Sequence, residues 1–215
     1  MNSIFRRSAL SVAGLMVTGG AIAGPAIAAP AASAASEPAA VLPGAPPAQG
    51  KRVLEYDYQR QPNSYYCAPA ATRIALSTQG KVLSQSEVAK KLGTTKAGTN
   101  SADDTTRVLN EVTGGGYQTT DIGGPKATPE QVDKLRVDVV QAVDAKRGVV
   151  ANITGIAVDT DGNAHSYPTG HYLSIVGYRD GGDTVKIADP YDSDSRYWMN
   201  DEKVADWVAE RGYSS

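Results

Sequence analysis

The only cysteine of this chain, Cys67, stands where a nucleophile is expected. It directly precedes the segment "APAATRIALSTQG", which is expected to form a helix over residues 68–78. The positive end of a helix dipole favours the thiolate, which is the nucleophilic form of cysteine. The alternative is a buried, inert thiol, because free cysteine also packs as a small apolar side chain.

The chain contains only two histidines, and one of them is placed to act as a general base. His171 opens the β-branched segment "HYLSIVGY", so we expect it at the end of a strand, on the rim of a sheet. His165 lies in the polar segment "DTDGNAHSYPTG" and is expected on the solvated surface. An imidazole beside a thiol can take its proton and return it to a leaving amine.

A carboxylate that orients His171 is predicted from the geometry of a hairpin. Asp189 ends the segment "KIAD", and the turn residues Asp180–Gly182 lie between it and His171. An antiparallel hairpin centred on Asp180 brings His171 and Asp189 to the same edge of the sheet. Asp189 would then fix the tautomer of the imidazole. The other interpretation is a turn aspartate before Pro190.

A side-chain amide near the cysteine is a candidate oxyanion donor. Gln61 precedes Cys67 by six residues, and Gln59 and Asn63 are nearby substitutes. Its amide and the backbone N–H of Cys67 could donate together to the oxygen of a tetrahedral intermediate.

Two stretches carry a resemblance to a known family. They are "QPNSYYCAPAATRIAL" and, about a hundred residues later, "GHYLSIVGYRDGGDTVKIADPY". Together they resemble the papain-like cysteine peptidases of family 39. That family includes the double-glycine-leader peptidases that mature bacteriocins and a secreted bacterial branch of family 39-like domains. The resemblance covers about residues 52–200.

The resemblance implies a papain-like cysteine peptidase fold, a role for each polar residue and no cofactor. Cys67 would be the nucleophile, His171 the general base, Asp189 the residue that orients it, and Gln61 a donor to the oxyanion. One position departs from the family pattern, which commonly has glycine after the cysteine where this chain has Ala68.

The elements that must position these residues follow from periodicity and capping signals. Helices are expected over 68–78, from the capping box Ser84–Glu87 to Gly93, over 102–112, from Thr128, and over 201–211. Strands are expected over 148–156, 171–180, 183–191 and 196–200, and a short strand or extended entry follows residue 51. Helices first and an antiparallel sheet second indicate an α+β fold, with N-terminal helices packed on a C-terminal sheet.

The first fifty residues differ in composition from the rest. Arg6 and Arg7 precede an apolar stretch and the sequence Ala26–Ala28, so residues 1–28 are predicted to be a signal peptide. Residues 29–50 are rich in alanine and proline and are predicted to be a flexible linker. Residues 51–215 are predicted to form one catalytic domain, secreted and monomeric, with no membrane span after signal removal.

Charge and composition exclude several classes of partner. The formal net charge is −2 and no basic stripe occurs, which argues against nucleic acid. One cysteine and two histidines without ligand spacing do not predict a metal site. The glycines of 113–117 are expected to end a helix, and Asp159 and Asp161 to form a turn. Tyr65 and Tyr66 are expected either to line a cleft or to pack in the core. Trp198 and Trp207 are expected in the core.

The function predicted from these residues is hydrolysis of a peptide or amide bond through a thioester on Cys67. Two alternatives stay open: a non-catalytic peptide- or cell-wall-binding module on the same scaffold, and a transglutaminase-like enzyme that transfers the acyl group to an amine. A peptide, a peptidoglycan cross-bridge and a small amide are all candidate substrates.

Overall fold

Two helices have the N-terminal capping residues that the sequence predicts. In the computed structural model of this chain, residues 50–191 and 196–215 are described, so the predicted signal peptide and nearly all of the predicted linker (29–50) lie outside these ranges. Ser84 accepts from the backbone N–H of Glu87 and completes a capping box, and Thr128 does the same with Gln131. The described residues form the helices α1 (Cys67–Ser77), α2 (Gln85–Leu92), α3 (Ala102–Thr113), α4 (Pro129–Asp144) and α5 (Asp201–Val208).

The strands of the described residues form one antiparallel sheet. Its strands are β1 (Arg52–Val53), β2 (Thr119–Thr120), β3 (Val149–Val158), β4 (Ala164–Arg179), β5 (Thr184–Ala188), β6 (Arg196–Asn200) and β7 (Tyr213–Ser214). The order is β2-β7-β3-β4-β5-β6, and β1 also pairs with β4. Within the described ranges, none of the helices is long and apolar enough to cross a membrane.

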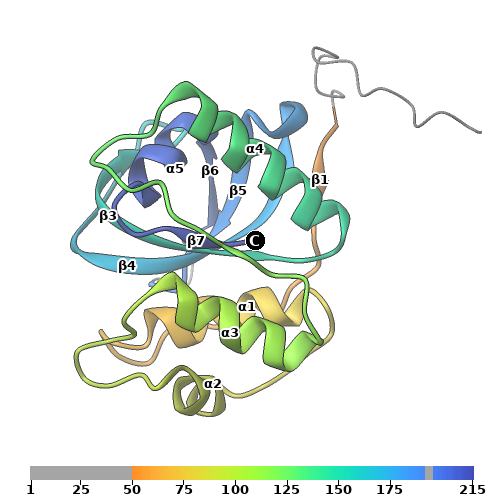
Figure 1. Ribbon diagram of the computed structural model, residues 1–215, viewed down its shortest axis with the longest axis vertical. Coiled ribbons are helices and arrows are strands. Elements are labelled where there is room, and N and C mark those ends of the chain that lie inside the picture. Colours follow the sequence, from red (N-terminus) through yellow and green to blue (C-terminus); the bar gives the residue numbers. More distant parts are fainter. Residues whose placement is uncertain (1–49, 192–195) are drawn as a thin grey trace, which may run out of the picture. The chain divides into compact units, whose positions relative to one another are not determined.

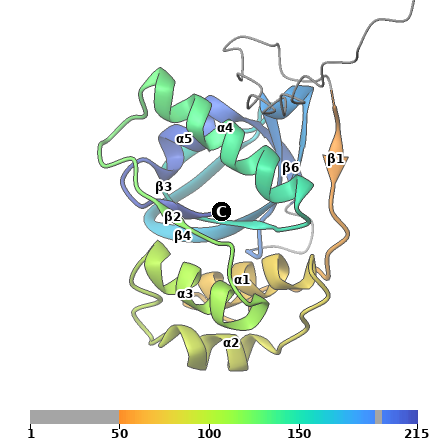
Figure 2. The ribbon, with the colours of Figure 1, turned by 45° about the vertical axis from the view of Figure 1, so that its right-hand side comes forward.

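Helices cover both faces of this sheet. α1, α2 and α3 lie on one side, and α4 and α5 lie on the other (Figure 1). Figure 2 shows the same two layers after a turn of 45°. Along β3, Val150 packs with α1 and α3, whereas Val149 and Ala151 pack in the core of α4 and α5. Because successive side chains of a strand point to opposite faces, the continuous apolar run of β3 fills both cores.

α1 lies very close to the sheet. A Cβ atom at Gly148, just before β3, would come within 2.9 Å of the Cα atom of Ala75 near the end of α1. The hydroxyl of Ser174 in β4 donates to the backbone carbonyl of Ala71, in the middle of the helix, at 2.7 Å. Small side chains on α1 and a glycine beside it allow this approach, so the helix that begins with Cys67 is packed directly on the sheet.

β4 begins earlier than predicted. The strand starts at Ala164 rather than at His171, so His171 lies inside it and not at its end. Residues 164–167 pair with the second half of β3, and the register shifts between Ile153 and Gly155. This irregularity leaves Pro168 outside the ladder, which is where a strand tolerates proline. This part of the strand was not predicted, because its polar residues and its proline lack the alternation of apolar and polar residues that indicates a strand.

Two further predictions on side chains are corrected by the structure. The side chain of His165 is only 18% exposed, contacts Asp159 at 3.0 Å and stacks on Tyr197 with ring centroids 3.7 Å apart, so the predicted surface position is wrong. Trp198 is half-buried and its ring is covered by cationic side chains, including that of Arg179 at 4.7 Å. Trp207 is buried, as predicted.

The two-residue strands β2 and β7 were not predicted, because two residues carry no periodic signal. They pair Thr119 with Ser214 and Thr120 with Tyr213. The backbones of Gln118 and Ser215 also exchange two hydrogen bonds, of 2.8 and 3.1 Å. β7 is thereby held beside β3, and the segment between α5 and β7 is placed near the middle of the sheet.

The hairpin between β4 and β5 contains a glycine that α4 requires. Gly182 has φ +105°, and a Cβ atom there would lie 2.7 Å from Cγ of Arg136 and 2.8 Å from Cγ2 of Val140. Gly162, in the turn between β3 and β4, has φ +87° but no neighbouring atom within 4 Å of such a Cβ. Both positions strain an L-residue, and only Gly182 adds a clash.

We therefore expect Gly182→Ala to destabilise the fold more than Gly162→Ala. Each should lose about 1–2 kcal/mol from the left-handed backbone. Overpacking against α4 should add about 1–3 kcal/mol at Gly182. Urea unfolding of the two variants measures both losses. Equal losses would show that α4 does not pack against this turn.

Candidate active site

A buried imidazole–carboxylate pair lies in the sheet. Nε2 of His171 contacts Oδ1 of Asp189 at 2.7 Å. The side chain of His171 is 4% exposed, and that of Asp189 is 0% exposed. Because Nε2 donates to the carboxylate, Nδ1 is the ring nitrogen left for exchange with another group. The structure thus brings together the two residues that the hairpin argument paired.

The register of the hairpin differs from the predicted one. The last pair is Ser174 with Ala188, so the next position places Asp189 opposite Leu173 rather than opposite His171. The turn is centred after Asp180, since Arg179 pairs with Thr184, and a bulge between Ile175 and Gly177 moves the pairing back by one residue. The difference of two residues preserves the face of the sheet, whereas a difference of one would have turned the two side chains apart.

Four donors satisfy the carboxylate of Asp189. Oδ1 accepts from His171 and from the backbone N–H of Tyr191 at 2.9 Å. Oδ2 accepts from the hydroxyl groups of Tyr167 at 2.7 Å and Tyr197 at 3.1 Å. Burial alone would raise the pKa of Asp189, but the hydrogen bond and charge of His171 and the other donors hold it below its usual value.

Tyr167 also fixes the plane of the imidazole. Its ring stacks on that of His171, with centroids 4.1 Å apart and an interplanar angle of 14°. Since its hydroxyl binds Asp189, the same side chain contacts both members of the pair. The imidazole is therefore held by a hydrogen bond at its edge and by a ring against its face.

An extended segment between β1 and α1 closes this region. The hydroxyl of Tyr58 donates to the carbonyl of Asp189 at 2.7 Å, and the backbone N–H of Gln61 donates to the carbonyl of Pro190 at 2.8 Å. Arg60 donates to the carbonyl of Tyr191 at 3.0 Å. These bonds connect the chain that leads to Cys67 with the chain that follows β5.

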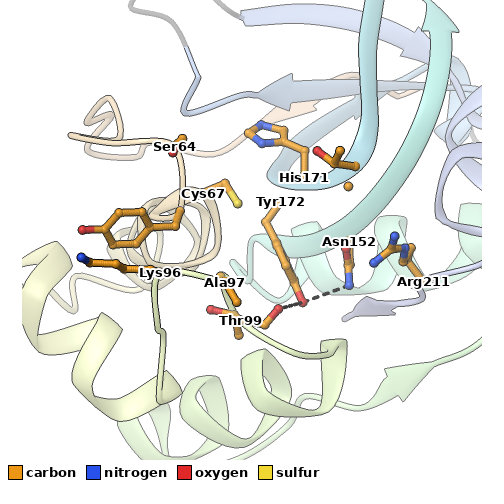
Figure 3. Close-up of a pocket in the computed structure, with 13 residues that line it drawn as sticks. Ser64, Cys67, Lys96, Ala97, Thr99, Asn152, His171, Tyr172 and Arg211 are labelled. Atoms are coloured by element: carbon orange, nitrogen blue, oxygen red, sulfur yellow. Dashed lines mark hydrogen bonds between the residues drawn. The ribbon is translucent and has the colours of Figure 1, made fainter.

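Cys67 is the first residue of α1 and lines the same cavity as His171. Figure 3 shows the two side chains at this cavity, Cys67 from the helix and His171 from the strand. No side chain caps the N-terminus of α1 in the described part of the chain. Ala68 is 0% exposed, packs in the core and is not among the cavity residues, so its methyl group does not narrow the approach to the thiol.

The charge state of His171 follows from its neighbours. Burial by itself would lower the pKa of His171, because it disfavours the imidazolium. The hydrogen bond to Asp189 and the interaction with Cys67 outweigh burial and raise this pKa to about 9. At neutral pH His171 is therefore an imidazolium between a carboxylate and a sulfur.

The side chain of Gln61 is buried, but it does not line the cavity. Its Nε2 donates to the backbone carbonyl of Asn63 at 2.7 Å, and its Oε1 is buried without a partner. One N–H of the amide remains for another acceptor. Gln59 does not line the cavity either, and its side-chain oxygen accepts from Gln85 at 2.9 Å. The role of Gln61 as an oxyanion donor stays a prediction.

The cavity has a volume of about 240 Å³ and is open to solvent. It is lined by Ser64, Tyr65 and Cys67, by residues 96–99 and 169–172, by Asn152 and by Arg211. Tyr172 forms part of its wall, accepting from Nδ2 of Asn152 at 2.9 Å (Figure 3). Tyr65 therefore lies at the cavity, whereas Tyr66 does not line it.

A model described as the Peptidase_C39 like family matches residues 53–215. The chain belongs to this family. The predicted family is thereby confirmed. No curated protein matches the chain.

Two solved structures are similar to this chain. A protein from Bacillus anthracis, described as a C39-like peptidase, is 14% identical with a TM-score of 0.53, over 77% of this chain and 96% of that one. The peptidase domain of Streptococcus ComA, an ABC transporter, is 15% identical with a TM-score of 0.49, over 74% of this chain and 96% of that one. The first likeness supports the α+β, papain-like fold, with helices on an antiparallel sheet, which was predicted.

Among the described residues of this family member, no group of three or more His, Cys, Asp or Glu side chains could hold a metal ion. Asp159 forms the predicted turn instead: its Oδ1 accepts from the backbone N–H groups of Asp161 and Asn163, both at 2.9 Å.

Sequence reasoning missed Tyr167, Tyr197, Asn152 and Arg211. Tyr167 and Tyr197 reach Asp189 from β4 and β6, and only the sheet register brings them together. Arg211 reaches the cavity through the unpredicted pairing of β7. One signal was available for Tyr167: once β4 is extended, it shares a face with His171, four residues on.

We expect the imidazole of His171 to titrate at about pH 9 in the folded protein. Asp189→Asn removes the opposite charge and should lower this pKa by about 1–3 units. Proton NMR of the histidine ring signals measures both values, and His165→Ala assigns the two histidines. A titration of His171 that is the same in the wild type and the Asn variant would contradict the ion pair.

Proposed function

We propose that this protein is a cysteine peptidase that hydrolyses a peptide or amide bond through a thioester on Cys67. The observation that carries the proposal is the buried His171–Asp189 pair at the same open cavity as the only thiol of the chain. A non-catalytic module has no need of a buried imidazolium at its binding cavity, because such a group is costly to bury without a function or a partner.

In the first half of the reaction, the Cys67 sulfur attacks the carbonyl carbon and the carbonyl π electrons move to oxygen. The tetrahedral intermediate collapses, the C–N bond breaks, and the imidazolium of His171 gives its proton to the leaving amine. The products are the free amine and a thioester on Cys67.

In the second half, neutral His171 removes a proton from a water molecule, whose oxygen attacks the thioester. The C–S bond then breaks, which releases a carboxylic acid and restores the thiolate and the imidazolium. The surrounding groups hold the imidazole in one orientation throughout. Asp189 keeps Nε2 as a donor, so that Nδ1 exchanges the proton in both halves.

The oxyanion of each intermediate needs donors beside Cys67. The backbone N–H of Cys67 lies at the uncapped N-terminus of α1, where the helix dipole favours negative charge. We assign the second donor to the free N–H of the Gln61 amide.

The site of action is proposed to be outside the cytoplasm. Residues 1–28 have the charge, the apolar stretch and the small residues of an export signal, which supports secretion of a domain that begins near residue 51. Expression of the full chain in a bacterial host, followed by N-terminal sequencing of protein from the medium, tests this. Recovery of an uncleaved chain from the cytoplasm alone would contradict it.

We expect Cys67→Ala and His171→Ala to lose at least about 10³-fold in activity, since both groups act in bond breaking. Asp189→Asn should lose less, because the thiol and the imidazole both remain and Tyr167 still stacks on the imidazole. Cleavage of a pool of internally quenched peptides gives kcat/KM for each variant. His165→Ala is the matched control, since it removes the other histidine and should retain activity.

The products separate the reaction classes. Mass spectrometry of a cleaved peptide should show the addition of water and a free amine. An adduct with an added amine in place of water would identify acyl transfer. Full activity in Cys67→Ala would contradict the mechanism.

A further inference from the structure

Among the described residues, the cavity at Cys67 is lined by two cationic side chains besides the imidazolium of His171, and by no carboxylate. Lys96 and Arg211 contribute the positive charges, and both side chains are exposed. The whole chain has a formal net charge of −2, so the cavity is positively charged although the chain as a whole is negative. A local positive field in a cleft attracts an anionic ligand.

Arg211 lies against the residue that precedes His171. Gly170 has φ +96°, and a Cβ atom there would stand 3.4 Å from Cζ of Arg211 and 3.4 and 3.5 Å from its two terminal nitrogens. The guanidinium thus lies across the bare backbone of Gly170. Because Gly170 has no side chain, the guanidinium lies close to the strand that carries the imidazole.

Arg211 has no acidic partner within residues 50–191 and 196–215. Other arginines of this part of the chain do: Arg136 contacts Asp201 at 2.7 Å, and Arg73 contacts Asp57 at 2.6 Å. The carboxylate of Asp104 acts on Tyr172 in the same cavity wall, but it contacts Arg107 at 3.2 Å. Arg211 therefore does not serve a structural ion pair among the described residues.

The backbone that carries Arg211 is fixed. Its N–H donates to the carbonyl of Val208 at 2.8 Å, and the carbonyl of the next residue, Gly212, accepts from the N–H of Asn152 at 3.1 Å. A Cβ atom at Gly212 would come within 2.6 Å of Oδ1 of Asp121. Arg211 is thus presented from a rigid turn next to β3, although its side chain is exposed.

Arg211 and Lys96 lie on opposite sides of the reacting groups. Figure 3 places Arg211 beside Asn152, and Lys96 on the other side of Cys67. A substrate whose carbonyl carbon lies at Cys67 therefore passes Arg211 on one side of the cleaved bond.

We propose that Arg211 binds a carboxylate of the substrate close to the cleaved bond, either an Asp or Glu side chain or a free C-terminus. The planar guanidinium suits this group, because it donates two parallel hydrogen bonds to a carboxylate. The inference rests on the proposed peptidase function, which brings a substrate into this cavity. It narrows the substrate class to peptides with a carboxylate close to the cleaved bond.

A protection experiment tests the anion site without any turnover. Iodoacetamide alkylates Cys67, and a dipeptide bound in the cavity should slow this reaction. The probes are the amides of Ala-Glu and Ala-Gln, and Ala-Ala with a free carboxylate. The two anionic dipeptides should protect at about two- to fivefold lower concentration than Ala-Gln amide, as an exposed ion pair allows.

Arg211→Gln should abolish this difference, and Arg211→Lys should retain part of it. The matched control is Lys203→Gln in α5, which removes the same charge from an exposed position outside the cavity and should keep the full difference. Comparison of Ala-Glu amide with Ala-Ala acid shows which carboxylate is preferred. Equal protection by charged and neutral dipeptides in the wild type, including no protection by either, overturns the proposal.

A cleavage experiment separates this inference from the proposed function. Internally quenched peptides carry Glu or Gln at one position on either side of the cleaved bond. At the position that meets Arg211, the two should differ in kcat/KM in the wild type and not in Arg211→Gln. Cleavage without this preference overturns the inference and leaves the peptidase function standing. A charge-dependent protection without cleavage of any peptide supports the anion site and contradicts the peptidase function. Loss of the preference in Lys96→Gln but not in Arg211→Gln would show that Lys96, and not Arg211, binds the carboxylate, and it would overturn the proposal.

Discussion

The carboxylate of Asp189 is the constraint on which the candidate site depends. A fully buried and unpaired carboxylate would cost several kcal/mol, so its oxygens must be satisfied by donors within the protein. Two tyrosine hydroxyls, one backbone N–H and the imidazole of His171 supply them. Because the carboxylate needs all these partners at once, the imidazole is held in one orientation and in its protonated form. The raised pKa of His171 is the electrostatic consequence of that arrangement.

The same network joins elements that are far apart in the chain. Tyr167 comes from β4, Tyr197 from β6, and Tyr58 and Gln61 from the segment before α1. Cys67 then lies at the start of a helix that packs closely on β4, so the thiol and the imidazole are held by different layers of the fold. Arg211, fixed by the pairing of β7 with β2 and β3, adds a cation beside this pair. The thiol and the imidazole therefore come from a helix and a strand, and the segments between elements complete the cavity around them.

Local signals predicted much of this arrangement. Cys67 before a helix, the capping boxes at Ser84 and Thr128, and the proximity of His171 to Asp189 all follow from short-range patterns. The predicted register was wrong by two residues because the turn is centred after Asp180, which moves the pairing by three residues, and the bulge moves it back by one. The contact survived because a difference of two residues preserves the face of the sheet. The start of β4 was missed because Pro168 and its polar neighbours lack the alternation of a strand. The tyrosines and Arg211 depend on strand pairing across the whole sheet, which no single segment encodes.

The central claim is that Cys67 and His171 form a reactive thiolate–imidazolium pair. The most direct test is the rate at which iodoacetamide alkylates Cys67 at about pH 6, where an ordinary free thiol is almost fully protonated and reacts slowly. Our account predicts a fast reaction in the wild type, a large loss of rate in His171→Ala, and a rate close to that of the wild type in His165→Ala. An equally slow reaction in the wild type and in His171→Ala would contradict it, since Cys67 would then be an ordinary thiol.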